Sequence, residues 1–178
     1  MKLRALVFLL LALAIAPVGA QAPAEPVERI RAAFLYRFAA YVEWPASAFP
    51  GPESPIVIGV VASDAVALEL AKAIPGRKVG SRPLKVVRLG PAEQPGNCCH
   101  ILYVGAESDR TEEILAAERA RPVLTVTDVD SGHPKGSVIN FVLADERLRF
   151  DISREAAERN GLQLRSQLLA VARQVSTP

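Results

Sequence analysis

The chain has 178 residues, of which 50% are hydrophobic and 22% are charged, and its 21 basic residues nearly balance its 19 acidic residues. This length fits one ordinary domain whose core can fold without metal ions or disulfide bonds. A chain with so little net charge has no electrostatic attraction to nucleic acid, so the composition argues against that class of partner.

The first twenty residues have the pattern of a secretory signal peptide. Lys2 and Arg4 precede an apolar run from Ala5 to Ala16, and Val18-Gly19-Ala20 closes it with small residues. The run is too short for a membrane span, which needs about 20 apolar residues. We therefore predict export to the periplasm, with cleavage after Ala20 or two residues later.

The predicted organisation is a signal peptide at 1–20, a flexible N-terminus at 21–27 and one domain at 28–175. All acidic residues lie beyond position 20, whereas Lys2 and Arg4 are removed with the signal peptide. The mature chain then has 19 basic and 19 acidic residues and no net charge.

The first predicted element of the mature chain is an amphipathic helix at 27–43. It is expected to end where Trp44 precedes Pro45, because a residue before proline is pushed out of the α region. Its apolar residues recur at spacings of three and four and so share one helix face: Val27, Ile30, Phe34, Phe38 and Tyr41.

Strands and helices then alternate along the chain. Asp109 and Glu112 have the spacing of a capping box at a helix start, and Lys85 and Arg88 suggest that their strand lies near a sheet edge. The predicted elements are strand 56–62, helix 65–74, strand 84–89, strand 100–104, helix 109–120 and strand 123–127.

This alternation predicts an α/β fold: a single domain with a mixed, mostly parallel sheet and helices on both faces. Strands at 137–143 and 147–152 form a C-terminal β-hairpin, which makes the sheet mixed. Two C-terminal helices follow. The first, at 153–159, is capped by Ser153, and the second, at 163–175, directs Leu164, Leu168, Leu169 and Val171 inward.

The sequence contains no pattern typical of a catalytic centre. It has no glycine-rich phosphate loop, no G-x-S-x-G elbow, no paired-histidine zinc motif and no C-x-x-C. We predict that the protein is not an enzyme and has no cofactor and no metal. His100 is interpreted as a structural residue at a strand start and His133 as a surface residue, and a hydrolase cannot be constructed from either.

The segment from Asp128 to Gly132 loosely resembles a calcium loop, but it lacks the third acid and the distant Glu of an EF-hand. We expect its carboxylates to be solvated side chains on a turn. Because parallel sheets bind ligands beyond the carboxyl ends of their strands, Asp128 and Ser131 remain candidates for a binding pocket.

Cys98 and Cys99 are the only cysteines, and they are adjacent. A trans peptide places neighbouring Cα atoms about 3.8 Å apart, below the roughly 4.4 to 6.8 Å of ordinary disulfides, so a bridge between them would be strained and easily reduced. We expect two unbridged thiols. A vicinal redox bridge and an intermolecular disulfide are the alternatives, since the compartment is oxidising.

Four more residues are candidates for binding. Trp44 could be a contact aromatic, although a Trp before Pro at the end of an apolar stripe is more often a core plug. Arg165, Ser166 and Gln167 form a polar patch at a helix start, which attracts carboxylates, but we expect Ser166 to serve as the helix cap instead.

Several segments, in order and spacing, resemble the YfiR-like periplasmic proteins over most of the mature chain, from about residue 28 onward. The resemblance implies a repressor that binds the periplasmic domain of an inner-membrane diguanylate cyclase, lowers cyclic di-GMP and biofilm formation, and is released by redox and envelope signals. The segments are 33–38, 42–45, 81–84, 99–104, 122–128, 136–151 and 166–169.

One position departs from this family. Many relatives carry a Cys in the first strand of the sheet that could pair with the residue matching Cys99, but here that position is Gly59. A cross-strand bridge therefore cannot form, and Cys98 is the alternative partner for Cys99.

Two functions from different classes follow from the sequence. The first is a regulatory protein that binds the periplasmic domain of an inner-membrane signalling protein, which predicts an exposed apolar patch with a polar rim. The second is a periplasmic module that binds or senses a small molecule, which predicts an enclosed apolar pocket. A homodimer is compatible with either.

Overall fold

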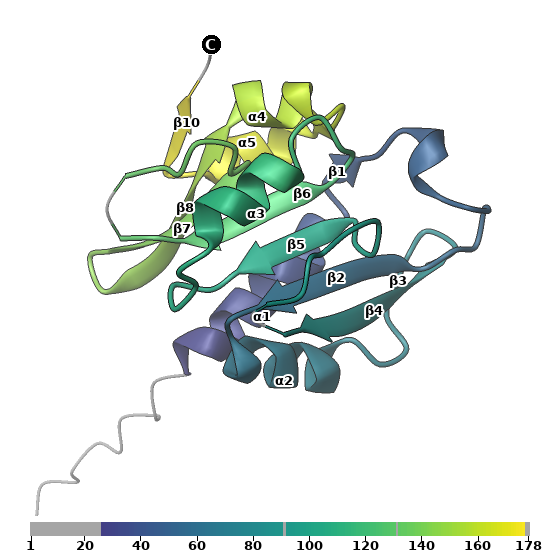
Figure 1. Cartoon of the computed structure of the whole chain (residues 1–178), viewed down its shortest axis with the longest axis horizontal. Coiled ribbons are helices and arrows are strands. Elements are labelled where there is room, and N and C mark those ends of the chain that lie inside the picture. Colours follow the sequence, from purple (N-terminus) through teal and green to yellow (C-terminus); the bar gives the residue numbers. More distant parts are fainter. Residues whose placement is uncertain (1–25, 91, 131, 177–178) are drawn as a thin grey trace, which may run out of the picture.

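The computed structural model describes residues 26–90, 92–130 and 132–176 (Figure 1). The predicted signal peptide at 1–20 lies outside these residues. An eight-stranded sheet forms the centre of the fold. Its strands are β2 (Ile56–Val61), β3 (Lys78–Val79), β4 (Arg82–Leu89), β5 (Ile101–Val104), β6 (Leu124–Asp128), β7 (Ile139–Ala144), β8 (Arg147–Ser153) and β10 (Gln174–Ser176).

The strand order is β10-β8-β7-β6-β5-β2-β4-β3. The five strands from β4 to β7 in this order are parallel, whereas β3 pairs antiparallel with β4 and β8 pairs antiparallel with β7. This arrangement confirms the predicted mixed, mostly parallel sheet with a C-terminal hairpin. The charged strand predicted at 84–89 does lie near an edge, with only the short β3 outside it.

Helices cover both faces of the sheet. They are α1 (Val27–Phe38), α2 (Asp64–Ala73), α3 (Thr111–Ala117), α4 (Arg154–Arg159) and α5 (Ser166–Val171), with a 3-10 turn η1 at Ala46–Ala48. The crossover through α2 leads from β2 to one side and the crossover through α3 leads from β5 to the other, so right-handed connections place these two helices on opposite faces. Figure 1 shows α3 in front of the sheet and α1 behind it.

The alternating side chains of β2 divide the core into two parts. Ile58 and Val60 point into the larger part, where they join buried residues of α1 and α2 such as Leu35 and Leu70. Val61 points into the smaller part beneath α3, which contains Ile114 and also Cys99. The two cysteines therefore belong to the thinner side of the molecule.

The first predicted helix was too long. Helix α1 ends at Phe38, and the chain turns so that β1 (Val42–Glu43) pairs antiparallel with β9 (Gln163–Leu164). Val42 is buried, so pairing at this point buries an apolar side chain that a continued helix would have placed elsewhere.

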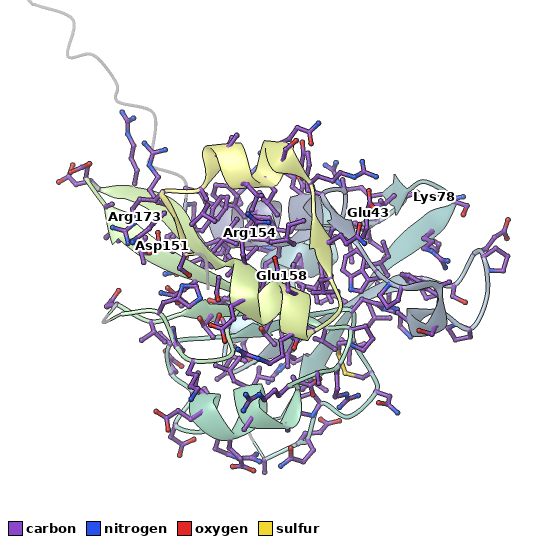
Figure 2. The ribbon with its side chains drawn as sticks, turned by 90° about the horizontal axis from the view of Figure 1, so that it is seen from above. Glu43, Lys78, Asp151, Arg154, Glu158 and Arg173 are labelled. Carbon is purple, nitrogen blue, oxygen red and sulfur yellow. A yellow bond between two sulfur atoms is a disulfide. The ribbon has the colours of Figure 1, made fainter. Side chains whose placement is uncertain are left out.

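The helix predicted at 163–175 is wrong in the same way. This segment divides into β9, the short helix α5 and β10, which pairs parallel with β8. Arg173 donates two hydrogen bonds to the Asp151 carboxylate on β8, and Figure 2 shows these two side chains lying together. Leu168 is buried as expected, but Val171 is 63% exposed.

Two predicted helix caps have different outcomes. The Ser153 hydroxyl accepts a hydrogen bond from the Ala156 N–H at 3.2 Å, which confirms the predicted cap of α4. The predicted capping box of α3 is wrong, because Arg110 is the N-cap and makes no side-chain capping bond. Ser108 shapes this start instead: its hydroxyl accepts a hydrogen bond from the Arg110 N–H.

In the part of the chain that the structure describes, no helix is both long and apolar enough to cross a membrane.

Candidate functional site

Asp128 lies at the carboxyl end of β6, as predicted, but its carboxylate already has partners inside the protein. Arg31 of α1 approaches Asp128 Oδ2 at 2.7 Å, and the Tyr103 hydroxyl donates to the same oxygen at 3.2 Å. The Asp128 side chain is only 10% exposed. Burial, together with the neighbouring Asp128 charge, raises the pKa of Tyr103. The ion pair between Arg31 and Asp128 links α1 to the end of β6.

The loop after Asp128 is shaped by a residue that the sequence did not single out. Asn140 of β7 is fully buried; its Oδ1 accepts from the Val129 N–H, and its Nδ2 donates to the carbonyls of Val129 and Gly132. Ser131 lies outside the described residues. His133 makes a contact of 2.8 Å with the Ser137 carbonyl. Among the described residues, no three His, Cys, Asp or Glu side chains gather as a metal site would require.

A hollow lies at the opposite end of the parallel strands, where β2, β5 and β6 begin. Its volume is about 680 Å³, and we call it the disulfide depression. Its walls include Phe49, Val57, Cys98, Cys99, His100 and Arg121. The sequence pointed to the carboxyl edge, so this position was not predicted.

Cys98 and Cys99 are joined by a disulfide, drawn in yellow in Figure 2. The expectation of two unbridged thiols is therefore wrong, and the vicinal bridge, one of the alternatives, is present. Cys99 is 8% exposed, whereas Cys98 is only partly buried.

Gly59 makes room for this bridge. A Cβ atom added to Gly59 would lie 2.5 Å from Cys99 Sγ, closer than side chains approach in real structures. The buried sulfur thus packs directly on the bare backbone of β2. A glycine within a β-branched strand often marks such a close approach.

His100 lines one wall of the depression, and both of its ring nitrogens are hydrogen-bonded to the backbone. Its Nδ1 accepts a hydrogen bond from the Val57 N–H at 3.1 Å, so Nε2 carries the proton and donates to the Ala48 carbonyl at 3.0 Å. Its ring stacks on Phe49 with centroids 4.4 Å apart. These contacts support the interpretation of His100 as a structural residue.

Trp44 and Arg82 hold the same wall from outside. The Trp44 indole N–H donates to the His100 carbonyl at 3.2 Å, and its ring meets Phe49 edge to face. The Arg82 guanidinium lies 3.6 Å from the centre of the Phe49 ring and donates to the Gly51 and Ser54 carbonyls. Trp44 is thus positioned as a packing residue, which favours the core-plug interpretation.

Arg121 fixes the loop that carries the cysteines. Its guanidinium donates to the Gly96 carbonyl and to the Asn97 side chain, and it also pairs with Glu118 at 3.3 Å. Glu118 is 1% exposed, and this burial raises the pKa of its carboxyl group. A buried carboxyl group at the end of α3 therefore anchors Arg121 in the wall of the disulfide depression.

We expect acid to weaken the fold through His100. Burial is the main cause that lowers the pKa of His100 below its usual 6.5, and the Arg82 charge acts in the same direction. Below pH 6.5 the histidine of the unfolded chain binds a proton more readily than His100 in the folded chain. The part of the stability that depends on neutral His100 is therefore fully present above pH 6.5 and is lost as the pH falls through the lowered pKa of the folded state.

Thermal unfolding between pH 7.5 and 5 measures this effect. His100→Phe should lose that part of the pH dependence and be destabilised at every pH, because the Val57 N–H and Ala48 carbonyl each lose a partner at a cost of about 1–3 kcal/mol. An equal acid response in the variant would contradict the assignment to His100.

In the predicted polar patch at 165–167, the Ser166 hydroxyl lies 3.5 Å from Gln167 Oε1, whereas Arg165 has a separate partner. Arg165 pairs with Glu43 at 3.1 Å across β1 and β9. Ser166 is the first residue of α5, and Arg165, not Ser166, occupies the cap position, so the predicted cap is wrong. Gln167 faces an apolar groove between α5 and α1.

This groove has a volume of about 260 Å³ and is lined mainly by Phe34, Phe38, Tyr41, Phe150, Leu168 and Val171. A second hollow of about 350 Å³ adjoins it across Arg37 and Tyr41 and extends to Arg77 and Lys78. We call the two together the α1 surface. The sequence did not indicate this surface, because the apolar residues in the C-terminal part of α1 have the spacing of a core-facing stripe.

A model of the YfiR/HmsC-like family, DUF4154, matches residues 28–173. The comparison with curated proteins found no match. The family match covers most of the chain and confirms the resemblance seen in the separate sequence segments.

Proposed function

Because the chain belongs to the YfiR/HmsC-like family, we propose that it is a periplasmic regulatory protein that represses a membrane-bound diguanylate cyclase. It binds the periplasmic domain of the cyclase and so lowers cyclic di-GMP. The family match over residues 28–173 carries this proposal. The signal peptide predicted at 1–20 supports the periplasmic location.

The α1 surface supports binding to a protein. Tyr41 is 39% exposed and Val171 is 63% exposed, and both line the apolar groove between α1 and α5. Exposed apolar groups beside polar ones are typical of interaction sites. The neighbouring Arg37 and Gln167 supply a polar rim to this groove.

The charge beside the groove indicates the chemistry of the partner segment. In the described part of the chain, Arg37, Arg77 and Lys78 form no ion pair with a carboxylate. Arg77 instead stacks over the Tyr36 ring at 4.6 Å. We therefore place at this surface an acidic segment of the cyclase's periplasmic domain whose apolar side chains enter the groove.

Deleting the gene in its native host tests the function. Cellular cyclic di-GMP should rise, and the wild-type gene should restore the low level, whereas a gene lacking residues 2–20 should not, because its product stays outside the periplasm. An unchanged level of cyclic di-GMP in the deletion strain, under both oxidising and reducing growth conditions, would contradict repression of a cyclase.

A further inference from the structure

We propose that a hollow between α3 and α4 binds a small organic anion, in which a carboxylate, phosphate or sulfonate group is attached to an apolar ring. The hollow has a volume of about 420 Å³, and we call it the α3–α4 hollow. It lies outside both the disulfide depression and the α1 surface, and the proposal goes beyond repression of a cyclase. Its lining includes Leu115, Arg119, Pro134, Lys135, Gly136 and Arg159.

Three separate segments of the chain bring positive charge to this hollow. Arg119 follows α3, Lys135 belongs to the loop between β6 and β7, and Arg159 is the last residue of α4. In Figure 1, α4 lies above α3. Glu112 supplies a carboxylate, so the described lining residues carry three cations and one anion, a net charge of +2.

Two of these cations are not neutralised by a partner within the described part of the chain. Arg119 and Lys135 are exposed, and neither forms an ion pair there. Arg159 does have a partner, because its guanidinium pairs with Glu155 one turn earlier in α4. Bringing like charges together costs free energy, which an anion bound among them would offset. The α3–α4 hollow therefore attracts anions.

The loop that carries Lys135 is held in place by hydrogen bonds. The Ser137 N–H donates to the Pro134 carbonyl at 3.0 Å and closes a β-turn around Lys135 and Gly136. Gly136 has a φ of +95°, which residues with a side chain rarely adopt. The Thr125 hydroxyl donates to the Gly136 carbonyl at 2.9 Å and ties the turn to β6. Because Lys135 stands on a fixed turn, less backbone freedom is lost when a ligand binds.

An apolar wall lies beside the charges. Leu115, Ala116 and Pro134 all line the hollow. Sites for small molecules typically combine such a wall with a few polar groups that fix the orientation of the ligand, and their volumes are about 300–1,000 Å³. Guanidinium and ammonium groups bind carboxylate and phosphate oxygens through charge-assisted hydrogen bonds. The hollow therefore suits an anion with an apolar ring better than an inorganic anion alone.

The test follows the binding of 2-naphthoate to the isotope-labelled mature chain by nuclear magnetic resonance. The backbone amide signals of Leu115, Arg119 and Gly136 should shift and saturate. The neutral 2-naphthamide has nearly the same shape but no charge, so it should bind about tenfold more weakly. Equal affinities of the two compounds, or shifts confined to the α1 surface or to the disulfide depression, would overturn the proposal.

Two variants test the cations directly. Arg119→Gln and Lys135→Gln each remove one charge, and each should weaken the binding of 2-naphthoate about fivefold. Lys85→Gln is the matched control, because Lys85 is an exposed cation on β4 that does not line the hollow. If both variants bind 2-naphthoate as tightly as this control does, the site is not in the α3–α4 hollow.

Sedimentation with lipid vesicles distinguishes a dissolved anion from a lipid headgroup of the same charge. The wild type should stay in solution with vesicles of phosphatidylglycerol, as it should with phosphatidylcholine. Binding to phosphatidylglycerol that Lys135→Gln abolishes would assign the cations to a membrane surface and overturn the dissolved ligand. None of these measurements needs a cyclase, so a negative result would leave the proposed function to its own test.

Discussion

Arg31→Met should lower the free energy of unfolding by about 3–5 kcal/mol, because it leaves a buried carboxylate without its cation. The Arg31 and Asp128 side chains are 19% and 10% exposed, and the pair joins α1 to the end of β6. After the substitution only the Tyr103 hydroxyl still contacts Asp128 Oδ2. Urea unfolding of the purified chain, followed by the fluorescence of Trp44, measures the change.

Two further variants separate the buried charge from the lost packing. Asp128→Asn in the Arg31→Met background removes the uncompensated charge and should recover much of the lost stability. Arg88→Met breaks the Arg88–Asp64 pair, whose side chains are 66% and 70% exposed, and should cost less than about 1 kcal/mol. A cost for Arg31→Met no larger than that for Arg88→Met would show that the ion pair is not essential to the fold.

The parallel part of the sheet could be predicted because its sequence signals are local. Strands β2, β5 and β6 are short apolar runs rich in β-branched residues, and turn residues stand between them and the helices. Their predicted limits agree with the observed ones to within one residue. Right-handed crossovers then determine the faces on which α2 and α3 lie.

The ends of the chain were predicted less well because their conformations depend on distant partners. Residues 42–43 and 163–164 both continue a helical pattern of apolar residues, yet each is the strand partner of the other. Likewise, β10 forms because β8 offers it a free edge and Asp151 receives Arg173. No window of neighbouring residues contains these pairings.

The site residues illustrate the same limit. Asp128 was placed correctly at the end of a strand. Its ion-pair partner, Arg31, lies in a helix and is 97 residues earlier in the chain, so local sequence could not indicate that this carboxylate is already paired. Gly59 did carry a signal, since a glycine inside an apolar strand suggests a close approach. It was interpreted as the loss of a cysteine partner, whereas it makes the space that Cys99 occupies.

Val171→Asp should abolish repression. A carboxylate placed in the apolar groove would have to be desolvated on binding, and it would repel the acidic segment that Arg37, Arg77 and Lys78 are expected to attract. The loss should be at least about 2 kcal/mol of binding, or about thirtyfold in affinity. In the deletion strain this variant should leave cyclic di-GMP as high as no gene at all, at periplasmic protein levels matched by immunoblot.

Leu143→Asp is the matched control, because Leu143 is 65% exposed, nearly the same as Val171, but lies in β7 near the hairpin to β8, outside the α1 surface. Both substitutions place a charge on an exposed apolar residue, so neither should change the stability of the fold by more than about 0.5 kcal/mol. Only Val171→Asp should relieve repression. If both variants repress like the wild type, the partner binds elsewhere; if both fail at normal protein levels, the loss reflects added negative charge and not the groove between α1 and α5.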